Sequence, residues 1–332
     1  MADRSLPSWN DGPAHAAILD FVARVTRRSG PDYVGPGERI AVFDNDGTLW
    51  CEQPVQAQVF FLVDRVKTLA ANDPGMKERQ PFKAFLEHDM KTLHELGKRG
   101  IMELFAATHA GMSEDEFDAV AQDWFATAKH PKLGRAFPKL AYQPQIELLE
   151  YLRANGFKTF IVTGGGVDLV RAFAEDAYGI PREQVIGSSV RLQFDAHGDQ
   201  VELMKTPELN SFDDGEAKPA NIGLAIGRRP LLAFGNSDGD LAMLRYVRAG
   251  TGPRLALLLH HDDATREFAY DRDFKLSPLK EALAHADAYG IQVVSMKRDW
   301  GQVFVADQPS PSPPARKSAA QAISDERRRG AH

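Results

Sequence analysis

Short apolar runs that stop at polar or glycine-rich turns recur along most of this 332-residue chain. Each is too short for a helix and is typical of a strand buried on both faces. The runs cover residues 40–43, 157–163, 184–190, 231–234 and 255–259. Helical patterns separate several of them, at 144–156 with Pro144 at the start, and at 167–181 with Gly179 and Pro181 near the end. Strands that alternate with helices pair in parallel, so we predict an open α/β sheet.

Residues 52–139 differ, because they contain no strand-like run and their apolar residues recur at helical spacing. One stripe consists of Val59, Val63 and Val66, and another of Phe82, Phe85, Leu86, Met90, Leu93 and Leu96. The tetrapeptide at 113–116, Ser-Glu-Asp-Glu, is typical of a capping box that opens a further helix. We therefore predict a core domain over 1–51 and 140–306, with an all-helical domain inserted at 52–139.

Two smaller features complete the organisation. Residues 192–205 predict a β-hairpin around His197, Gly198 and Asp199, to which we assign no chemistry. Residues 307–332 are rich in Pro, Ser and charge and have almost no large apolar side chains, so we predict a disordered tail.

The amino-acid composition indicates which kinds of binding partner to expect. A formal net charge of −6 argues against a dense basic surface for nucleic acid or anionic membrane, so a small molecule is the expected partner. The single cysteine, Cys51, cannot form an intramolecular disulfide. The chain has neither a signal-peptide pattern nor a run of about 20 apolar residues, and we expect a cytoplasmic protein. Nothing in the sequence specifies an oligomeric state.

Asp44 and Asp46 directly follow the first predicted strand, in the segment Asp-Asn-Asp-Gly-Thr. A calcium loop fails on spacing, because its glycine and glutamate positions are occupied by Leu49 and Val55. A simple turn remains an alternative. Carboxylates at the carboxyl end of a parallel strand lie where open α/β sheets bind ligands. One acid of such a pair can attack an electrophile while the other transfers a proton, and a phosphate ester would also require a divalent cation.

Two further segments suit an anion. Thr163 and Gly164 end the second predicted strand at the start of a helix, where a hydroxyl and free amides favour negative charge. The glycines there match neither a dinucleotide fingerprint nor a Walker loop, so a tight turn is an equal alternative. Lys218 lies near the start of another predicted helix, and by itself would be an ordinary surface lysine.

The segment Gly-Asn-Ser-Asp-Gly-Asp at 235–240 allows two interpretations. As G-x-S-x-G it would make Ser237 the nucleophile of an esterase, with His260, His261 or His285 as partner. As an acidic loop after another strand it would supply Asn236 and Asp240 to Mg²⁺.

The order of these four segments resembles the four motifs of the haloacid dehalogenase superfamily, over residues 36–262. The spelling of the first motif, the helical insertion after the first strand and the Thr-Gly-Gly turn look most like its phosphoserine-phosphatase-like branch. The resemblance implies a Rossmann-like open parallel sheet flanked by helices, with residues 52–139 as a C1-type cap.

The resemblance also implies roles for individual residues. Asp44 would form an aspartyl-phosphate and Asp46 would act as general acid and then base. Thr163, Gly164 and Lys218 would hold the phosphate. The Mg²⁺ ligands would be Asp44, the Asp46 carbonyl and the side chains of the fourth motif, Asn236 and Asp240. Retention of the second acid, Asp46, favours phosphoryl transfer over dehalogenation.

Two departures from the family pattern bear on metal and substrate. Asn236 stands where aspartate is usual, which removes a charge from the metal site and leaves Asn236, Asp238 and Asp240 as alternative ligands. Gln53 stands where phosphoserine phosphatases have a glutamate, so phosphoserine is one candidate among small phosphorylated metabolites. The residues that lead into the cap are candidates for lining the pocket: Trp50, Glu52, Gln53 and Gln56. For Trp50, packing of the linker is an equal alternative.

We therefore expect a Mg²⁺-dependent phosphomonoesterase that acts through an aspartyl-phosphate on a small phosphorylated metabolite. The alternatives are an esterase built on Ser237 and a non-catalytic phosphate-binding protein. For the loop at 260–263, which has two histidines beside two acids, a polar turn is favoured over a separate metal site.

Overall fold

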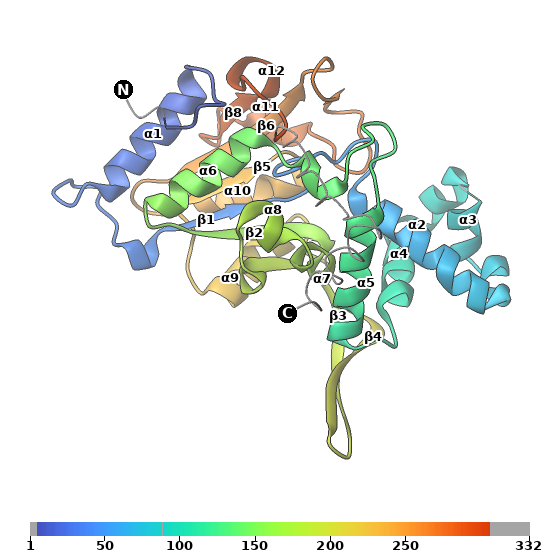
Figure 1. The fold of residues 1–332 in the computed structure, drawn as a ribbon. Helices are drawn as coiled ribbons and strands as arrows, with labels where there is room; N and C mark the ends of the chain where they lie inside the picture. The colour runs from blue at the N-terminus through green and yellow to red at the C-terminus, as the bar shows by residue number, and fades with distance from the viewer. Residues whose placement is uncertain (1–4, 88, 306–332) are drawn as a thin grey trace, which may run out of the picture.

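The computed structural model describes residues 5–87 and 89–305. A sheet of mostly parallel strands forms its centre, with the order β4-β3-β2-β1-β5-β6-β7 and with β8 also paired to β6 (Figure 1). The five predicted runs are the parallel strands β1 (Ile40–Phe43), β2 (Lys158–Gly166), β3 (Val185–His197), β5 (Leu232–Gly235) and β6 (Leu255–Asp262). The prediction of an α/β fold is therefore confirmed.

The edges of the sheet differ from a purely parallel arrangement. β4 (Gln200–Ser211) and β7 (Ala269–Tyr270) pair antiparallel with β3 and β6. β8 (Gln292–Ser295), which the sequence did not predict, pairs parallel with β6. The chain runs from β1 to β2 and β3 on one side and then crosses to β5 on the other. The order therefore reverses at β1, and ligands bind beyond the carboxyl ends of the strands at such a point.

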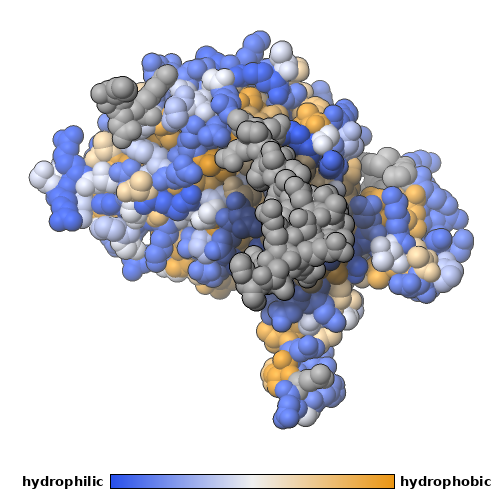
Figure 2. All heavy atoms as spheres, viewed as in Figure 1, coloured by the Kyte–Doolittle hydropathy of each residue, from blue (hydrophilic) through white to orange (hydrophobic). Residues whose placement is uncertain are grey.

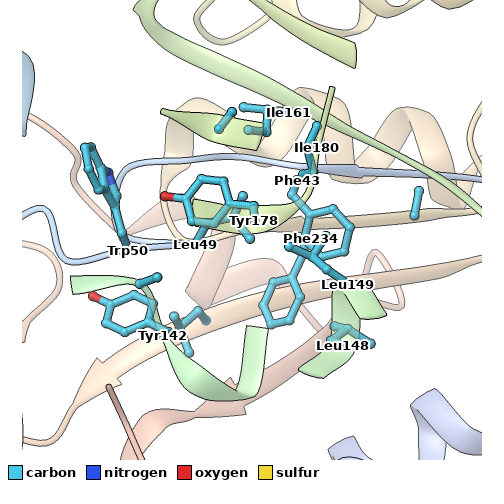
Figure 3. Packing of buried hydrophobic residues seen from close by; sticks show 14 of the residues in the cluster. Phe43, Leu49, Trp50, Tyr142, Leu148, Leu149, Ile161, Tyr178, Ile180 and Phe234 are labelled. Carbon is cyan, nitrogen blue, oxygen red and sulfur yellow. The ribbon is translucent and has the colours of Figure 1, made fainter. Parts of the chain in front are cut away.

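Both faces of the sheet are covered by helices, which explains why all four residues of β1 are buried. Ala41 and Phe43 face a large cluster that includes α1 (Pro13–Thr26) and α6 (Gln143–Ala154). Figure 3 shows part of this cluster, with Phe43 beside Phe234 of the neighbouring strand. Ile40 and Val42 face the second cluster, with α9 (Ala217–Ile226), α10 (Leu241–Arg248) and α11 (Glu281–His285). Successive side chains of a strand point to opposite faces, so one short apolar run serves both clusters.

The segment between β1 and β2 is helical, as predicted. It contains α2 (Ala57–Asn72), α3 (Phe82–Leu86), α4 (Met90–His109) and α5 (Glu114–Thr127), with no strand among its described residues. The capping box of Ser113 and Glu116 is formed at the start of α5. The two predicted stripes meet in one cluster that includes Val66, Phe82 and Phe85. Met90 and Leu93 lie outside the residues whose side chains are described.

One predicted helix is broken. The pattern at 167–181 predicted a single element, whereas the structure has α7 (Val167–Arg171) and α8 (Ala174–Tyr178) with Phe173 between them. The Phe173 ring stacks on Trp50 at a centroid distance of 4.4 Å, and its backbone leaves the helical conformation. A tertiary contact therefore overrides the local helical pattern here. The chain then turns at Gly179, whose φ of +65° favours glycine, as predicted for the end of this segment.

The predicted hairpin is longer than expected. β3 pairs with β4 from Ser189 opposite Ser211 to His197 opposite Gln200, and Gly198 in the turn has φ of +64°. Its outer part projects from the molecule (Figure 1), and Figure 2 shows hydrophobic side chains on it. Phe194, opposite Leu203, is 66% exposed, so this part of the hairpin does not belong to the core. The predicted tail, residues 307–332, lies outside the described residues. None of the described helices has the length and apolar character that a membrane span requires.

Lys205 joins the hairpin to the helices. Its side chain is buried, with Nζ 2.5 Å from Asp168 Oδ2 in α7 and 5.3 Å from the ring centroid of Phe117 in α5. Its main chain bonds the turn between α4 and α5, where Gly111 N donates to Lys205 O and Lys205 N donates to Met112 O. The hairpin therefore connects the helical segment to α7.

Replacement of Lys205 by methionine tests this anchor. Lys205→Met keeps the length of the side chain but leaves Asp168 without its buried cation, so we expect a loss of about 3 kcal/mol in the free energy of unfolding by urea denaturation. Arg191→Ala is the control, because the pair of Arg191 and Glu208 on the same hairpin is 67% and 60% exposed and should contribute less than about 1 kcal/mol. Equal losses in the two variants would contradict the anchoring role.

His109 at the end of α4 is a second buried polar group in the helical segment. Its ring lies 4.1 Å from that of Phe105 and stacks on Phe117 at 4.3 Å, and its Nδ1 lies 2.6 Å from Phe105 O. Burial lowers the pKa of His109 to about 4. The unfolded chain, with an ordinary histidine pKa near 6.5, therefore binds this proton more readily than the folded chain as the pH falls.

The pH dependence of stability should reflect His109. Its contribution is present above pH 6.5 and is lost as the pH falls toward 4, by about 2.5 kcal/mol between pH 7.5 and 4.5. His109→Phe, which keeps an aromatic ring, should lose correspondingly less stability over this interval in urea titrations. His285→Gln, at an exposed histidine, should follow the wild type. If His109→Phe kept the wild-type pH dependence, His109 would not be the titrating group.

Candidate active site

Two loops, the end of one strand and the start of one helix meet at the carboxyl edge of the sheet. Asp44 follows β1, Thr163 lies within the end of β2, and Asn236 follows β5. Lys218 lies in the first turn of α9. These are the positions that the sequence singled out, and the structure brings them together at the point where the strand order reverses.

Lys218 bridges two carboxylates. Its Nζ lies 2.7 Å from Asp44 Oδ1, 2.6 Å from Asp240 Oδ1 and 2.9 Å from Val162 O. An ammonium has three N–H donors, so these three acceptors fix its position. Burial alone would lower the pKa of Lys218, but Asp240 and Asp44 raise it above its ordinary value, and the group is a cation. Burial, together with Asp240, raises the pKa of Asp44, while Lys218 opposes this shift.

Asp46 faces the end of β2. Its Oδ1 accepts a hydrogen bond from Trp50 Nε1 at 2.8 Å. A Cβ added at Gly165 would lie 3.5 Å from Asp46 Oδ2 and 3.2 Å from Thr163 Oγ1, so both side chains border the same glycine. Burial raises the pKa of Asp46, while hydrogen bonds from Trp50 and Asn45 oppose the shift. A carboxyl with a raised pKa is suited to hold and return a proton.

Two hydroxyls, Thr163 Oγ1 within the predicted phosphate-binding segment and Ser188 Oγ in β3, hold the main chain of this segment. Thr163 Oγ1 accepts from Gly165 N at 3.0 Å, and Gly164 O accepts from Ser188 Oγ at 2.8 Å. Gly166 N donates to Gln58 Oε1 of α2 at 2.7 Å, which links the helical segment to this loop. Gln58 was not predicted from the sequence, because a polar residue in the first turn of a helix has no distinguishing pattern.

The three side chains considered as metal ligands in the loop after β5 point in different directions. Asp238 accepts from the main-chain amides at the start of α11, Lys280, Glu281 and Ala282. Asp240 Oδ2 accepts from the amides of Asn236 and Ser237, while its Oδ1 binds Lys218. Asn236 Oδ1 accepts from Thr48, which also contacts Asp44. The roles of Asn236 and Asp240 as metal ligands stay predictions.

Thr48 connects Asn236 to Asp44. Its hydroxyl lies 3.0 Å from Asn236 Oδ1 and 3.3 Å from Asp44 Oδ2, oriented to donate to either oxygen. The Thr48 hydroxyl therefore lies between an oxygen of Asn236 and an oxygen of Asp44. Carboxylate, amide and carbonyl oxygens are the ligands that Mg²⁺ prefers, and Mg²⁺ keeps several waters. Asp44, the Asp46 carbonyl and Asn236 fit that ion, whereas the described residues contain no group of three or more His, Cys, Asp or Glu side chains that could hold a metal.

Glu52 lies directly behind Asn236 and is fully buried. Its Oε1 accepts from Asn236 Nδ2 at 2.8 Å and Tyr270 OH at 3.0 Å. Its Oε2 accepts from Gln56 Nε2 at 2.9 Å and Ser277 Oγ at 3.0 Å. Burial raises the pKa of Glu52 well above its ordinary value, and Asp46 and Asp44 add to the shift.

The other residues predicted to line the substrate pocket, Trp50 and Gln53, differ in their contacts. Trp50 is buried between the core and the helical segment, where it stacks on Phe173 and donates a hydrogen bond to Asp46. Its role in lining a substrate pocket stays a prediction. Gln53 Nε2 is buried without a hydrogen-bond partner among the described residues. The partners Tyr270 and Ser277 were missed, because they lie more than 200 residues beyond Glu52 in segments with no motif.

The geometry required for a serine esterase is not formed. Ser237 Oγ donates to Asp240 Oδ2 at 3.1 Å. His261 contacts Gly47 O and Glu267, and His260 and His285 lie closest to Asp271 and Glu281. No histidine is hydrogen-bonded to Ser237 in the described part of the chain.

The loop at 260–263 likewise does not gather its side chains on one ion. Asp262 accepts from Ser295 Oγ and Lys297 N, while Asp263 binds Arg266. His261 instead holds the carbonyl of Gly47 at 2.7 Å.

Comparison with known proteins agrees with this architecture. A family model for haloacid dehalogenase-like hydrolases matches residues 41–245. The chain thus belongs to the haloacid dehalogenase-like hydrolase family.

Solved structures with a TM-score of 0.50 or more share the fold at low sequence identity. A functionally unknown protein from Anaerococcus prevotii is 16% identical, with a TM-score of 0.54 over 85% of this chain and 91% of that one. A protein of unknown function from Bordetella pertussis is also 16% identical, with a TM-score of 0.50 over 77% and 98%. A phosphoserine phosphohydrolase-like protein from Francisella tularensis is 16% identical, with a TM-score of 0.39 over 75% and 98%. No curated protein matched this chain.

Gly47 offers a direct test of the crowding in this site. Its φ is +78°, and an added Cβ would lie 2.0 Å from Asn236 Nδ2 and 2.4 Å from Glu52 Oε1. Gly111 has the same φ of +78° with nothing within 4 Å. Both alanine variants should lose about 1 kcal/mol for the left-handed backbone, but Gly47→Ala should lose at least about 2 kcal/mol more in urea denaturation. Equal losses would contradict close packing beneath Gly47.

Proposed function

We propose that the chain is a Mg²⁺-dependent phosphomonoesterase that acts through an aspartyl-phosphate on Asp44. The observation that carries the proposal is the fixed Lys218 ammonium, with Asp44 on one side and the Thr163 loop close by. Asp46, two residues after Asp44, lies in hydrogen-bonding contact with Trp50 and faces Gly165. A nucleophile, a proton carrier and a cation are the groups that phosphoryl transfer requires.

The proposed reaction has two displacements. An oxygen of Asp44 attacks phosphorus, the bond from phosphorus to the leaving oxygen breaks, and Asp46 gives its proton to that oxygen. Asp46 then takes a proton from water, whose oxygen attacks phosphorus and releases phosphate from Asp44. Lys218 keeps Asp44 oriented and offsets its charge, while Thr163 and Gly164 would hold the phosphate oxygens. Mg²⁺, held by Asp44, the Asp46 carbonyl and Asn236, would reduce the repulsion between the two anions.

We further propose that the helical segment at 52–139 is a cap over the site. Its α2 reaches the phosphate loop through Gln58, and Trp50, Glu52 and Gln56 lie where the chain enters it. The substrate class is a small phosphorylated metabolite, with phosphoserine as one candidate. A buried free cysteine and the absence of a disulfide requirement support a cytoplasmic setting.

Hydrolysis of p-nitrophenyl phosphate tests the reaction class. Activity should require Mg²⁺, disappear with EDTA and return when Mg²⁺ is restored. Asp44→Asn should lower the rate by at least about a thousandfold, because it removes the attacking oxygen's charge. Ser237→Ala should remain active, since only the esterase hypothesis requires Ser237.

Two outcomes would overturn the proposal. Loss of turnover in Ser237→Ala with retention in Asp44→Asn would indicate an esterase. Binding of phosphate or vanadate without turnover of any phosphate ester would indicate a phosphate-binding protein.

A further inference from the structure

Glu52 is a buried carboxylate that the proposed reaction does not use. It is fully buried, and in the described part of the chain no cationic side chain pairs with it. Instead, four neutral donors fill the four acceptor positions of its two oxygens. All its lone pairs are engaged, so it has none left for a direct metal bond. Of its four contacts, the one with Asn236 connects Glu52 to the candidate active site.

The hydrogen bond to Glu52 fixes the orientation of the Asn236 amide. Asn236 Nδ2 donates to Glu52 Oε1 at 2.8 Å, which leaves Asn236 Oδ1 on the side of Thr48 and Asp44. A flip of the amide would place its oxygen against a carboxylate oxygen and its NH₂ where a cation would bind. Both contacts would be repulsive. Glu52 therefore determines that an oxygen faces the proposed metal position.

The contact between Glu52 and Asn236 also affects the negative charge available to a cation at the proposed metal position. With Asn236 as ligand, the donor set contains a single carboxylate, that of Asp44, and a single negative charge attracts a divalent cation weakly. Glu52 brings a second carboxylate to the far side of the amide and polarises its oxygen toward the cation.

We infer that Glu52 is a positioning residue for Asn236, and that the Glu52–Asn236 pair replaces a carboxylate ligand at position 236. The inference rests on the proposed Mg²⁺ site. It predicts that amide and carboxylate can be exchanged between the two positions without loss of metal binding.

A double-mutant cycle with Mg²⁺ alone as the probe tests this. Glu52→Gln keeps the size of the side chain but removes its charge and two acceptor positions, so we expect Mg²⁺ affinity by isothermal titration calorimetry to fall about 10- to 100-fold. Asn236→Asp should also be impaired, because two buried carboxylates would then meet at the 2.8 Å contact. The exchange Glu52→Gln/Asn236→Asp restores one amide and one carboxylate, and should bind Mg²⁺ at least as tightly as wild type.

A charge control separates this role from a general effect of burial. Asp299 is a buried carboxylate in α12 (Met296–Asp299) that accepts from Ser295 N at 2.8 Å and contacts neither Glu52 nor Asn236. Asp299→Asn should leave Mg²⁺ affinity within about threefold of wild type. A similar loss in Asp299→Asn and Glu52→Gln would overturn the inference.

The remaining outcomes are distinguishable. Wild-type affinity in Glu52→Gln, or an exchange variant no better than the single variants, would overturn the pairing while leaving the phosphatase proposal intact. If wild type binds no Mg²⁺, the proposed metal site itself fails. Circular dichroism of each variant establishes folding, and if Asn236→Asp does not fold, recovery of folding in the exchange variant still supports the pairing.

Discussion

The bridge that Lys218 makes between Asp44 and Asp240 is the interaction on which the candidate site depends. It connects the loop after β1 to the loop after β5, the two strands between which the chain reverses its order in the sheet. Asp240 holds the amides of Asn236 and Ser237 with its other oxygen, so the same carboxylate shapes the loop that presents Asn236. Breaking one buried partner of such a bridge leaves the others uncompensated. The position of Asn236 therefore depends on a lysine that never contacts it.

The helical segment and the hairpin are joined to this centre through polar contacts at its rim. Gln58 reaches the Gly166 amide from α2, and Lys205 reaches Asp168 in α7 from the hairpin. Gly166 and Asp168 lie two residues apart, at the end of β2 and the start of α7. A movement of the helical segment would thus act on the end of β2, which contains Thr163. The proposed cap is therefore physically connected to the residues proposed to bind phosphate.

The sequence allowed the strands to be predicted because each is a continuous apolar run buried on two faces. β8 was missed, since four residues with only two large apolar side chains carry no such signal. The break at Phe173 was missed because it arises from stacking on Trp50, which is 123 positions earlier in the sequence. The motifs placed Asp44, Thr163, Lys218 and Asp240 at one edge, as found. The motifs did not show which of Asn236, Asp238 and Asp240 would be a metal ligand. The orientation of these side chains depends on Lys218 and on the main-chain amides at the start of α11, which are remote in the sequence.

The balance of buried charge argues for a cation at this edge. Asp44 and Asp240 contact Lys218, while the buried acids Asp46 and Glu52 have no hydrogen bond to it. Burial raises the pKa values of Asp44, Asp46 and Glu52. A site built for a neutral ligand would gain stability by replacing some of these acids with neutral side chains, since each pays for desolvation. A divalent cation lowers the pKa values of nearby carboxyls and offsets their mutual repulsion. Asp46 accepts a hydrogen bond from Trp50 Nε1, whereas Asp44 contacts the Lys218 ammonium directly. We therefore expect Asp46 to keep a raised pKa while Asp44 ionises. The proposed division of roles between the two acids thus follows from the direct contact of Asp44, and not of Asp46, with Lys218.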